Sequence, residues 1–286
     1  MQVNILLFFQ KLSNEFLDKM FIMITNLGSE VFYFLAIAFI FWCINKKTGI
    51  RIMIVLLSST LLNNTIKNIF KTKRPFLDDR IEGVYIKSAK GYSFPSGHTQ
   101  GITTFWYYLM KNYKAKCVKY LGCAIILLVG LSRLYLRVHW PTDVVGGFCI
   151  AIIFVLFIDK IIKYVEQKQM GLLSKIFVLL LSNAIMLLYI SEDVAKAFGV
   201  LTGAVLGYIF EIEYVDFKEQ ASLLKQIVKV ILGLGCILIV KYLLKEIFPN
   251  ELHFHYIRYF VIGIFTTLIL PFVFVKLRLS GTKKWY

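Results

Sequence analysis

Long apolar runs constrain this chain more than any other feature of its sequence. Several stretches of about 15 to 22 residues carry almost no charge, close to the roughly 20 residues that a helix needs to cross a bilayer core. One stretch, residues 231–240, holds no charged side chain. The chain is 58% hydrophobic, and a soluble core hides one such helix but not a succession of them. The sequence therefore predicts an all-α fold, a polytopic transmembrane helical bundle in the membrane bilayer.

About eight to nine spans are expected, after a helix over residues 4–26 whose charged positions suit the membrane surface. The second span is the least convincing, because Asn63, Asn64 and Lys67 lie in its last turns. Polar groups inside a membrane helix are costly, so these are expected to face the bundle interior or a wet cavity. The predicted spans are residues 29–45, 51–70, 98–112, 117–135, 142–162, 173–190, 195–210, 226–247 and 256–277.

A change of composition near residues 165–172 predicts two parts. Residues 1–165 are expected to hold the surface helix and a catalytic membrane core, and residues 166–286 additional transmembrane helices with few candidate functional groups. A scaffold, a lateral gate and a dimer surface are all considered for these later helices. A homodimer is therefore among the partner arrangements under consideration.

The net charge of +16 raises the question of nucleic acid as a partner. The basic residues, however, lie in short clusters between apolar segments, as in cytoplasmic loops that follow the positive-inside rule, so no nucleic acid is expected. With these clusters inside, the loops 71–97 and 134–141 fall on the extracytoplasmic side of a multi-pass cell (plasma) membrane protein. The five cysteines show no metal-ligand spacing, and neither a metal nor a cofactor is predicted.

The segment from Lys67 to Pro75 is the first of three that gather unusual polar residues at the outer ends of predicted helices. Lys67 and Arg74 are seven positions apart, about two helical turns, so they are expected to project from nearly the same face. Pro75 disfavours helix at Arg74 and places that guanidinium where the helix gives way to loop. Two cations at the membrane boundary suit an anionic headgroup, whereas Lys71 and Lys73 are interpreted as lysines reaching toward water.

The second segment, Pro95-Ser96-Gly97-His98, directly precedes an apolar helix. Ser96 suits the N-cap of that helix, and Gly97 lets backbone N–H groups approach an anion closely. A helix N-terminus with free amides is a ready phosphate site, and His98 is expected within reach of a phosphate bound there.

The third segment contains Arg133, His139 and Asp143, with Pro141 suited to the first turn of the helix that follows. Asp143 then reaches one imidazole nitrogen of His139, which fixes the tautomer and leaves the other nitrogen free to attack. Arg133 offers a planar fork for phosphate oxygens. Together the three segments supply a phosphate clamp, a nucleophile and a proton donor, so phosphoryl transfer is the leading interpretation.

These segments resemble the type 2 phosphatidic acid phosphatase (PAP2) superfamily, in its membrane lipid phosphatase branch. The family pattern reads Lys-x6-Arg-Pro, Pro-Ser-Gly-His and Ser-Arg-x5-His-x3-Asp, and its parts stand here in order at residues 67–75, 95–98 and 132–143. The resemblance implies a PAP2-like core plus extra C-terminal helices. It also implies metal-independent hydrolysis of a lipid phosphate or diphosphate through a phosphohistidine intermediate.

The resemblance assigns a role to each motif residue. His139 is expected to attack phosphorus, Asp143 to orient that imidazole, and His98 to protonate the leaving oxygen. The residues expected to bind the phosphoryl oxygens are Lys67, Arg74, Ser96, Gly97 and Arg133.

A site at the end of membrane helices favours a lipid phosphate substrate that arrives sideways from the bilayer. Undecaprenyl diphosphate is the first candidate, followed by phosphatidic acid and phosphatidylglycerol phosphate, and the Lys-, Ile- and Asn-rich composition suggests a bacterial source. Two alternatives remain: a lipid phosphotransferase, and a transporter or flippase, for which His139 would be dispensable. Haloperoxidase activity is disfavoured, because those members of the superfamily are soluble.

Overall fold

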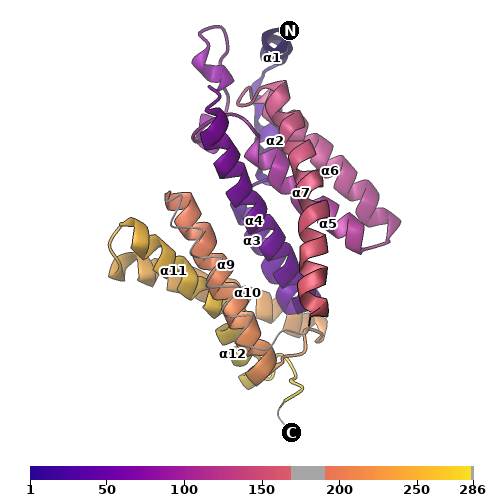
Figure 1. Cartoon of the computed structure of the whole chain (residues 1–286), viewed down its shortest axis with the longest axis vertical. Helices are drawn as coiled ribbons and strands as arrows, with labels where there is room; N and C mark the ends of the chain where they lie inside the picture. Colours follow the sequence, from indigo (N-terminus) through magenta and orange to yellow (C-terminus); the bar gives the residue numbers. More distant parts are fainter. Residues whose placement is uncertain (169–190, 285–286) are drawn as a thin grey trace. The chain divides into compact units, whose positions relative to one another are not determined.

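The computed structural model describes residues 1–168 and 191–284. Within those ranges the regular elements are helical, apart from one isolated β-bridge between Phe217 and Thr282, so the predicted all-α class is confirmed for the described chain. Turns of π-helix, residues 40–44, 211–215 and 265–269, continue α3, α9 and α11. The α-helices are α1 (Gln2–Lys11), α2 (Glu15–Asn26), α3 (Glu30–Phe39), α4 (Lys46–Phe70), α5 (Gly97–Asn112), α6 (Lys116–Tyr135), α7 (Pro141–Gln167), α9 (Glu192–Phe210), α10 (Leu223–Ile247), α11 (Leu252–Ile264) and α12 (Leu270–Lys276) (Figure 1).

Six helices of the described chain are long and apolar enough to cross a membrane, which makes this a multi-pass membrane protein. A seventh span is counted if the helices Glu15–Asn26 and Glu30–Ile44, bent by 47°, form one. The predicted count of eight to nine is not confirmed. One reason is that α5 has only 16 residues, and another is that the predicted span 173–190 lies outside the described residues.

The N-terminal segment differs from the single helix predicted over residues 4–26. It forms α1 and α2, which are separated by residues 12–14. Asn14 adopts an extended backbone, and its side chain accepts a hydrogen bond from Leu17 N at 3.0 Å. An asparagine cap of this kind starts a new helix, so the apolar periodicity on either side belongs to two helices.

The chain is organised in two compact units. The first comprises residues 1–34 and 58–161, and the second comprises residues 35–57 together with the described part of 162–286. The division of the sequence near residue 165 into a catalytic core and additional helices stays a prediction.

Polar side chains on the last turns of α4 hold the start of α5 in the first unit. Asn63 is buried and donates to Gln100 Oε1 at 2.8 Å and to Pro95 O at 3.3 Å. Gln100 Nε2 in turn donates to Ser59 O at 2.9 Å. The expectation that Asn63 faces the bundle interior is therefore confirmed. α6 packs against α5 and against α1 and α2, which closes this unit around the polar segments.

In the second unit α9 and α11 lie side by side (Figure 1). Glycines make the close approach possible, because a Cβ atom on Gly203 would meet Phe260 O at 2.0 Å and one on Gly263 would meet Ala204 N at 2.6 Å. A buried ion-pair group lies in the same unit: Lys46 Nζ is 2.9 Å from Glu211 Oε1 and 2.8 Å from an Asp216 oxygen.

Candidate active site

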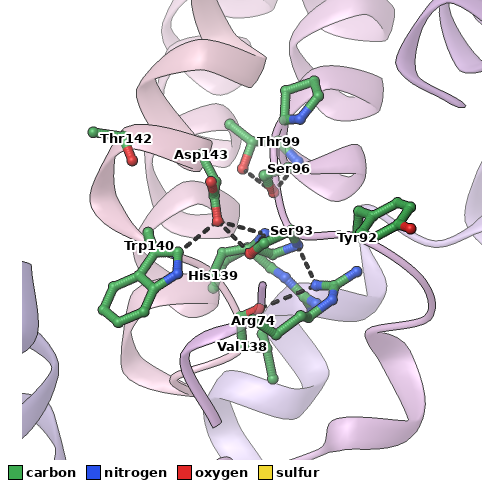
Figure 2. A network of polar contacts seen from close by, with 12 residues as sticks. Arg74, Tyr92, Ser93, Ser96, Thr99, Val138, His139, Trp140, Thr142 and Asp143 are labelled. Carbon is green, nitrogen blue, oxygen red and sulfur yellow. Dashed lines mark hydrogen bonds and ion pairs between the residues drawn. The ribbon is translucent and has the colours of Figure 1, made fainter. Parts of the chain in front are cut away.

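His139 and Asp143 form the centre of the polar network in the first unit (Figure 2). His139 lies in the connection between α6 and α7, and Asp143 in the first turn of α7, which begins at Pro141. His139 Nδ1 is 3.2 Å from Asp143 Oδ2, and Trp140 N donates to the same oxygen at 2.8 Å. Because the carboxylate faces Nδ1, the imidazole proton belongs there and the Nε2 lone pair stays available.

Arg74 faces that second imidazole nitrogen. Its Nη1 atom is 3.0 Å from His139 Nε2 and also donates to Val138 O at 3.0 Å. The rest of the guanidinium donates to backbone carbonyls, from Nε to Gly91 O at 3.0 Å and from Nη2 to Lys90 O at 2.6 Å. These acceptors are neutral, so they hold the guanidinium in place without cancelling its charge.

Lys67 reaches the same loop from the end of α4. Its Nζ donates to Tyr92 O at 2.6 Å and to Ser93 O at 3.4 Å. The argument that Lys67 and Arg74 share one helix face is wrong, because α4 ends before Lys71, whose φ of 48° is left-handed. The two cations are brought together instead by the carbonyl groups of residues 90–93.

The backbone around Ser96 brings the second motif to the third. Ser96 caps α5 as predicted, its Oγ accepting from Thr99 N at 3.4 Å, and its own N donates to Asp143 O at 2.9 Å. The approach depends on Gly147 of α7, where a Cβ atom would lie 2.7 Å from Ser96 O. The Ser96 Oγ also accepts from Thr99 Oγ1 at 3.0 Å, so its lone pairs are used within the helix cap.

His98 and Gly97 are both half-buried. A Cβ atom on Gly28 would be 3.2 Å from His98 Cβ, which places His98 against the turn between α2 and α3. No hydrogen bond joins the His98 imidazole to any residue in the described chain. A Cβ on Gly97 would be 3.4 Å from Asn63 Oδ1, an ordinary contact, so the glycine is not required there by packing.

Arg133 is fully buried on α6, near the end of that helix. Its Nη1 donates to Thr25 Oγ1 at 2.7 Å and to Ser88 Oγ at 3.2 Å, and Nη2 donates to Ser88 Oγ at 3.2 Å. Its Nε has no hydrogen-bond partner among the described residues. The predicted planar fork is thus present, and in this structure it bonds neutral hydroxyl groups.

The electrostatics of the site are strongly positive. Burial lowers the pKa of the His139 imidazole well below its ordinary value, and neighbouring positive charges lower it further. In decreasing order these charges are those of Arg74, Arg133 and Lys67, followed by His98. The imidazole is therefore neutral near pH 7, the form in which Nε2 is a nucleophile.

Motif reasoning did not identify three residues of this network. Ser93 bonds Asp143, and Thr25 and Ser88 bond Arg133. None belongs to the spaced pattern, and two of them come from loops or helices far away in the sequence. The one available sequence signal concerned Ser93, which lies three residues before Ser96 of the second motif segment.

Across residues 1–168 and 191–284, no group of three or more His, Cys, Asp and Glu side chains is arranged to hold a metal ion. Metal independence of the reaction stays a prediction for experiment.

Two models of one protein family match this chain. The PAP2 superfamily model matches residues 48–167, and the model described as PAP2 superfamily phosphatase, transmembrane extension, matches residues 195–282. The first match includes all three motif segments. The second covers most of the later helices.

Three relatives are named as lipid phosphatases. A probable sphingosine-1-phosphate phosphatase of Dictyostelium discoideum is 32% identical, over 53% of this chain and 40% of that protein. Phosphatidylglycerophosphatase B of Bacillus subtilis is 30% identical, over 51% of this chain and 76% of that protein. An undecaprenyl-diphosphatase of Sulfolobus acidocaldarius is 32% identical, over 36% of this chain and 50% of that protein.

The chain therefore belongs to the PAP2 superfamily. The predicted class of enzyme, a lipid phosphatase, is confirmed at the level of that family. The match spans 40%, 76% and 50% of the three relatives, and their names differ in substrate.

Proposed function

We propose that this protein hydrolyses a lipid phosphate or diphosphate through a covalent phosphohistidine on His139. The observation that carries the proposal is the position of the His139 imidazole. Asp143 Oδ2 lies 3.2 Å from one nitrogen and Arg74 Nη1 lies 3.0 Å from the other. The first contact orients the ring, and the second places a phosphate-binding group beside the attacking atom.

The proposed reaction has two steps. Nε2 of His139 forms a bond to phosphorus while the bond from phosphorus to the lipid oxygen breaks. His98, which takes up a proton when the anionic substrate binds, gives that proton to the leaving oxygen. A water molecule then attacks phosphorus and returns a proton to His98, the nitrogen–phosphorus bond breaks, and phosphate leaves. Positioning and charge stabilisation supply most of the rate in such transfers.

Lys67, Arg74 and Arg133 are the proposed binding groups for the phosphoryl oxygens, together with the backbone at Ser96 and Gly97. For Arg74 this requires a change of partner. Its Nη1 hydrogen bond must pass from the imidazole to a phosphoryl oxygen, because the present 3.0 Å separation leaves no space for phosphorus. The carbonyls that hold the other guanidinium nitrogens keep Arg74 nearby during this change.

The substrate is proposed to enter from the bilayer on the extracytoplasmic side of the plasma membrane. Undecaprenyl diphosphate is the first candidate, because one relative is named for hydrolysis of that lipid. Phosphatidic acid and phosphatidylglycerol phosphate are next, and another relative is named for the latter. Residues 1–165 are proposed as the catalytic core and residues 166–286 as additional helices. A homodimer is also under consideration as the arrangement of the chain, and native mass spectrometry tests it.

Phosphate release from a panel of detergent-solubilised lipids tests the function. The wild-type protein and His139→Ala are assayed side by side, with EDTA present. Release that survives EDTA and disappears in the variant supports a metal-independent histidine phosphatase. Release that continues in His139→Ala contradicts the mechanism. If no phosphate is released but an added second lipid becomes phosphorylated, phosphotransfer replaces hydrolysis. If the protein moves a lipid across the membrane and His139→Ala does so equally well, transport replaces it.

A further inference from the structure

Ser93 occupies a central position in the site, although it belongs to none of the three motif segments. Its side chain is fully buried. The hydroxyl donates to Asp143 Oδ2 at 2.5 Å, and the same Oγ lies 3.4 Å from His139 Nδ1 (Figure 2). Ser93, His139 and Asp143 thus form a closed group of three side chains, in which each contacts the other two.

The backbone of Ser93 connects this group to the first motif. Its N–H donates to Thr72 O at 2.8 Å, and its carbonyl accepts from Lys67 Nζ at 3.4 Å. One residue therefore contacts the segment that carries the phosphate-binding cations and the pair that carries the nucleophile. A shift of Ser93 would change the distance between these two parts of the site.

The carboxylate of Asp143 needs such support. Its Oδ2 atom receives Trp140 N at 2.8 Å and faces the His139 ring, whereas its Oδ1 atom has no hydrogen-bond partner among the described residues. A carboxylate held through one oxygen depends on the donors at that oxygen for its orientation. The Ser93 hydroxyl supplies a further donor at that oxygen and a second polar neighbour for Nδ1, which restricts both the carboxylate and the imidazole.

We propose that Ser93 is a positioning residue for the phosphoryl transfer. It acts through Asp143 and His139 and holds the imidazole plane in the orientation that directs Nε2 toward phosphorus. This inference rests on the proposed function, since it concerns the same reaction. It predicts a lower rate of the chemical step and unchanged lipid binding. The reason is that the Ser93 hydroxyl contacts His139 and Asp143 and not the side chains proposed to bind phosphate.

The test compares Ser93→Ala, Ser93→Thr and Ser280→Ala with the wild type on the best lipid of the panel. Ser93→Ala is expected to lower kcat about tenfold while KM stays within about twofold. A loss of about tenfold is typical when a residue that orients a metal-ligating histidine is removed, and Ser93 has a comparable role toward His139. Ser93→Thr restores the hydroxyl and is expected to recover most of kcat. Ser280 is a buried serine whose hydroxyl lacks a hydrogen-bond partner in the described chain, so Ser280→Ala is the matched control and keeps wild-type turnover.

Rapid-quench trapping of the phosphoenzyme and measurement of thermal unfolding accompany the kinetics. Slower phosphoenzyme formation in Ser93→Ala, at an unchanged melting temperature, supports positioning. A kcat within twofold of the wild type overturns the proposal while the phosphatase function stands. A loss of kcat that matches a loss of folded protein, without recovery in Ser93→Thr, assigns Ser93 a structural role and also overturns it.

Two further outcomes are distinguishable. If Ser93→Ala does not fold, Ser93→Cys, which has nearly the same volume and is a weak donor, takes its place with the same expected loss of kcat. If the wild type releases phosphate from no lipid, with or without an acceptor, the proposed function itself fails and the role of Ser93 fails with it.

Discussion

Two clusters of charged side chains in the part of the chain that the structure describes differ in how their charges are compensated. The site cluster (Lys67, Arg74, Arg133, His139 and Asp143) contains three basic side chains, one histidine and one carboxylate. Its guanidinium and ammonium groups are held mainly by neutral backbone carbonyls and hydroxyls. The extension cluster (Lys46, Lys283, Glu211 and Asp216) contains two cations and two carboxylates that pair with each other. Lys46 and Glu211 are buried, Asp216 is partly buried, and Lys283 lies at the exposed edge of the cluster.

This difference is the one expected between the proposed binding site and a structural element. Buried charges are costly unless they are paired, and the extension cluster meets that requirement with its own side chains. The site cluster leaves an excess of positive charge inside the protein, which is tolerable when an anion completes it. A phosphoryl group supplies two negative charges and several acceptor oxygens, so it fits the missing part of the site cluster and has no counterpart in the extension cluster.

Removal of the nucleophile should have the largest effect. His139→Ala is expected to lower turnover by at least about 10³-fold, because no other group in the pathway can take over the covalent step. The melting temperature should stay close to that of the wild type, since the variant removes a neutral ring. Phosphate release and thermal unfolding in detergent measure the two properties, and substantial residual turnover would assign the chemistry elsewhere.

Replacement of a site guanidinium by an ammonium tests charge against geometry. Arg74→Lys keeps the positive charge but loses the planar fork, and kcat/KM should fall by about 10²-fold, as when one transition-state donor is removed. Steady-state kinetics on the preferred lipid give this value. An activity equal to that of the wild type would show that charge alone suffices at this position.

A break in the extension cluster should affect stability and leave chemistry intact. Lys46→Met leaves Glu211 buried without its ammonium partner, and we expect the free energy of unfolding to fall by about 3 kcal/mol. Turnover per folded molecule should remain within about twofold of the wild type. Unfolding in mixed detergent micelles measures the loss.

The control for that experiment is Lys283→Met. Lys283 is exposed and its Nζ is 3.9 Å from Asp216, so its removal should change the free energy of unfolding by less than about 1 kcal/mol. Equal losses in the two variants, or a specific loss of kcat in Lys46→Met, would remove the distinction between the two clusters.

The pH dependence tests the excess of positive charge around His139. The reactive neutral imidazole is present above its pKa, and burial with the nearby cations lowers that pKa. The acid limb that belongs to His139 should therefore lie below pH 6.5, the ordinary histidine value. Arg133→Gln removes one of the cations, raises the pKa of His139 and should move this limb to higher pH, whereas Lys46→Met should not move it.

The smallest effect is expected at Lys71, the exposed lysine between the two site cations. Its side chain lies outside the network of the site cluster, so Lys71→Ala should change kcat/KM by less than about twofold. High salt screens exposed charges and should lower kcat/KM in the wild type and the variant alike. Measurement at two ionic strengths separates these contributions. A severe loss would show that the phosphate site extends further along the loop.

The sequence predicted the paired side chains of the site better than their supports. His139 and Asp143 are four positions apart at the start of a proline-initiated helix, and that local geometry alone brings them together. The contacts that hold Lys67 and Arg74 could not be predicted, because the backbone carbonyl groups of residues 90–93 that accept their hydrogen bonds carry no side-chain signal. The fold showed the same limit: apolar periodicity located α4, α6 and α7, but Asn14 divided one expected N-terminal helix into two.

Trapping of the phosphorylated intermediate tests the central claim most directly. The wild type, His98→Ala, Lys46→Met and His139→Ala are mixed with a lipid substrate, quenched within milliseconds under alkaline conditions and digested for mass spectrometry. Phosphate on His139 is predicted in the wild type, in His98→Ala and in Lys46→Met. No phosphorylated residue is predicted in His139→Ala. Phosphate on a different residue, or turnover in the wild type without any phosphoenzyme, would contradict the account.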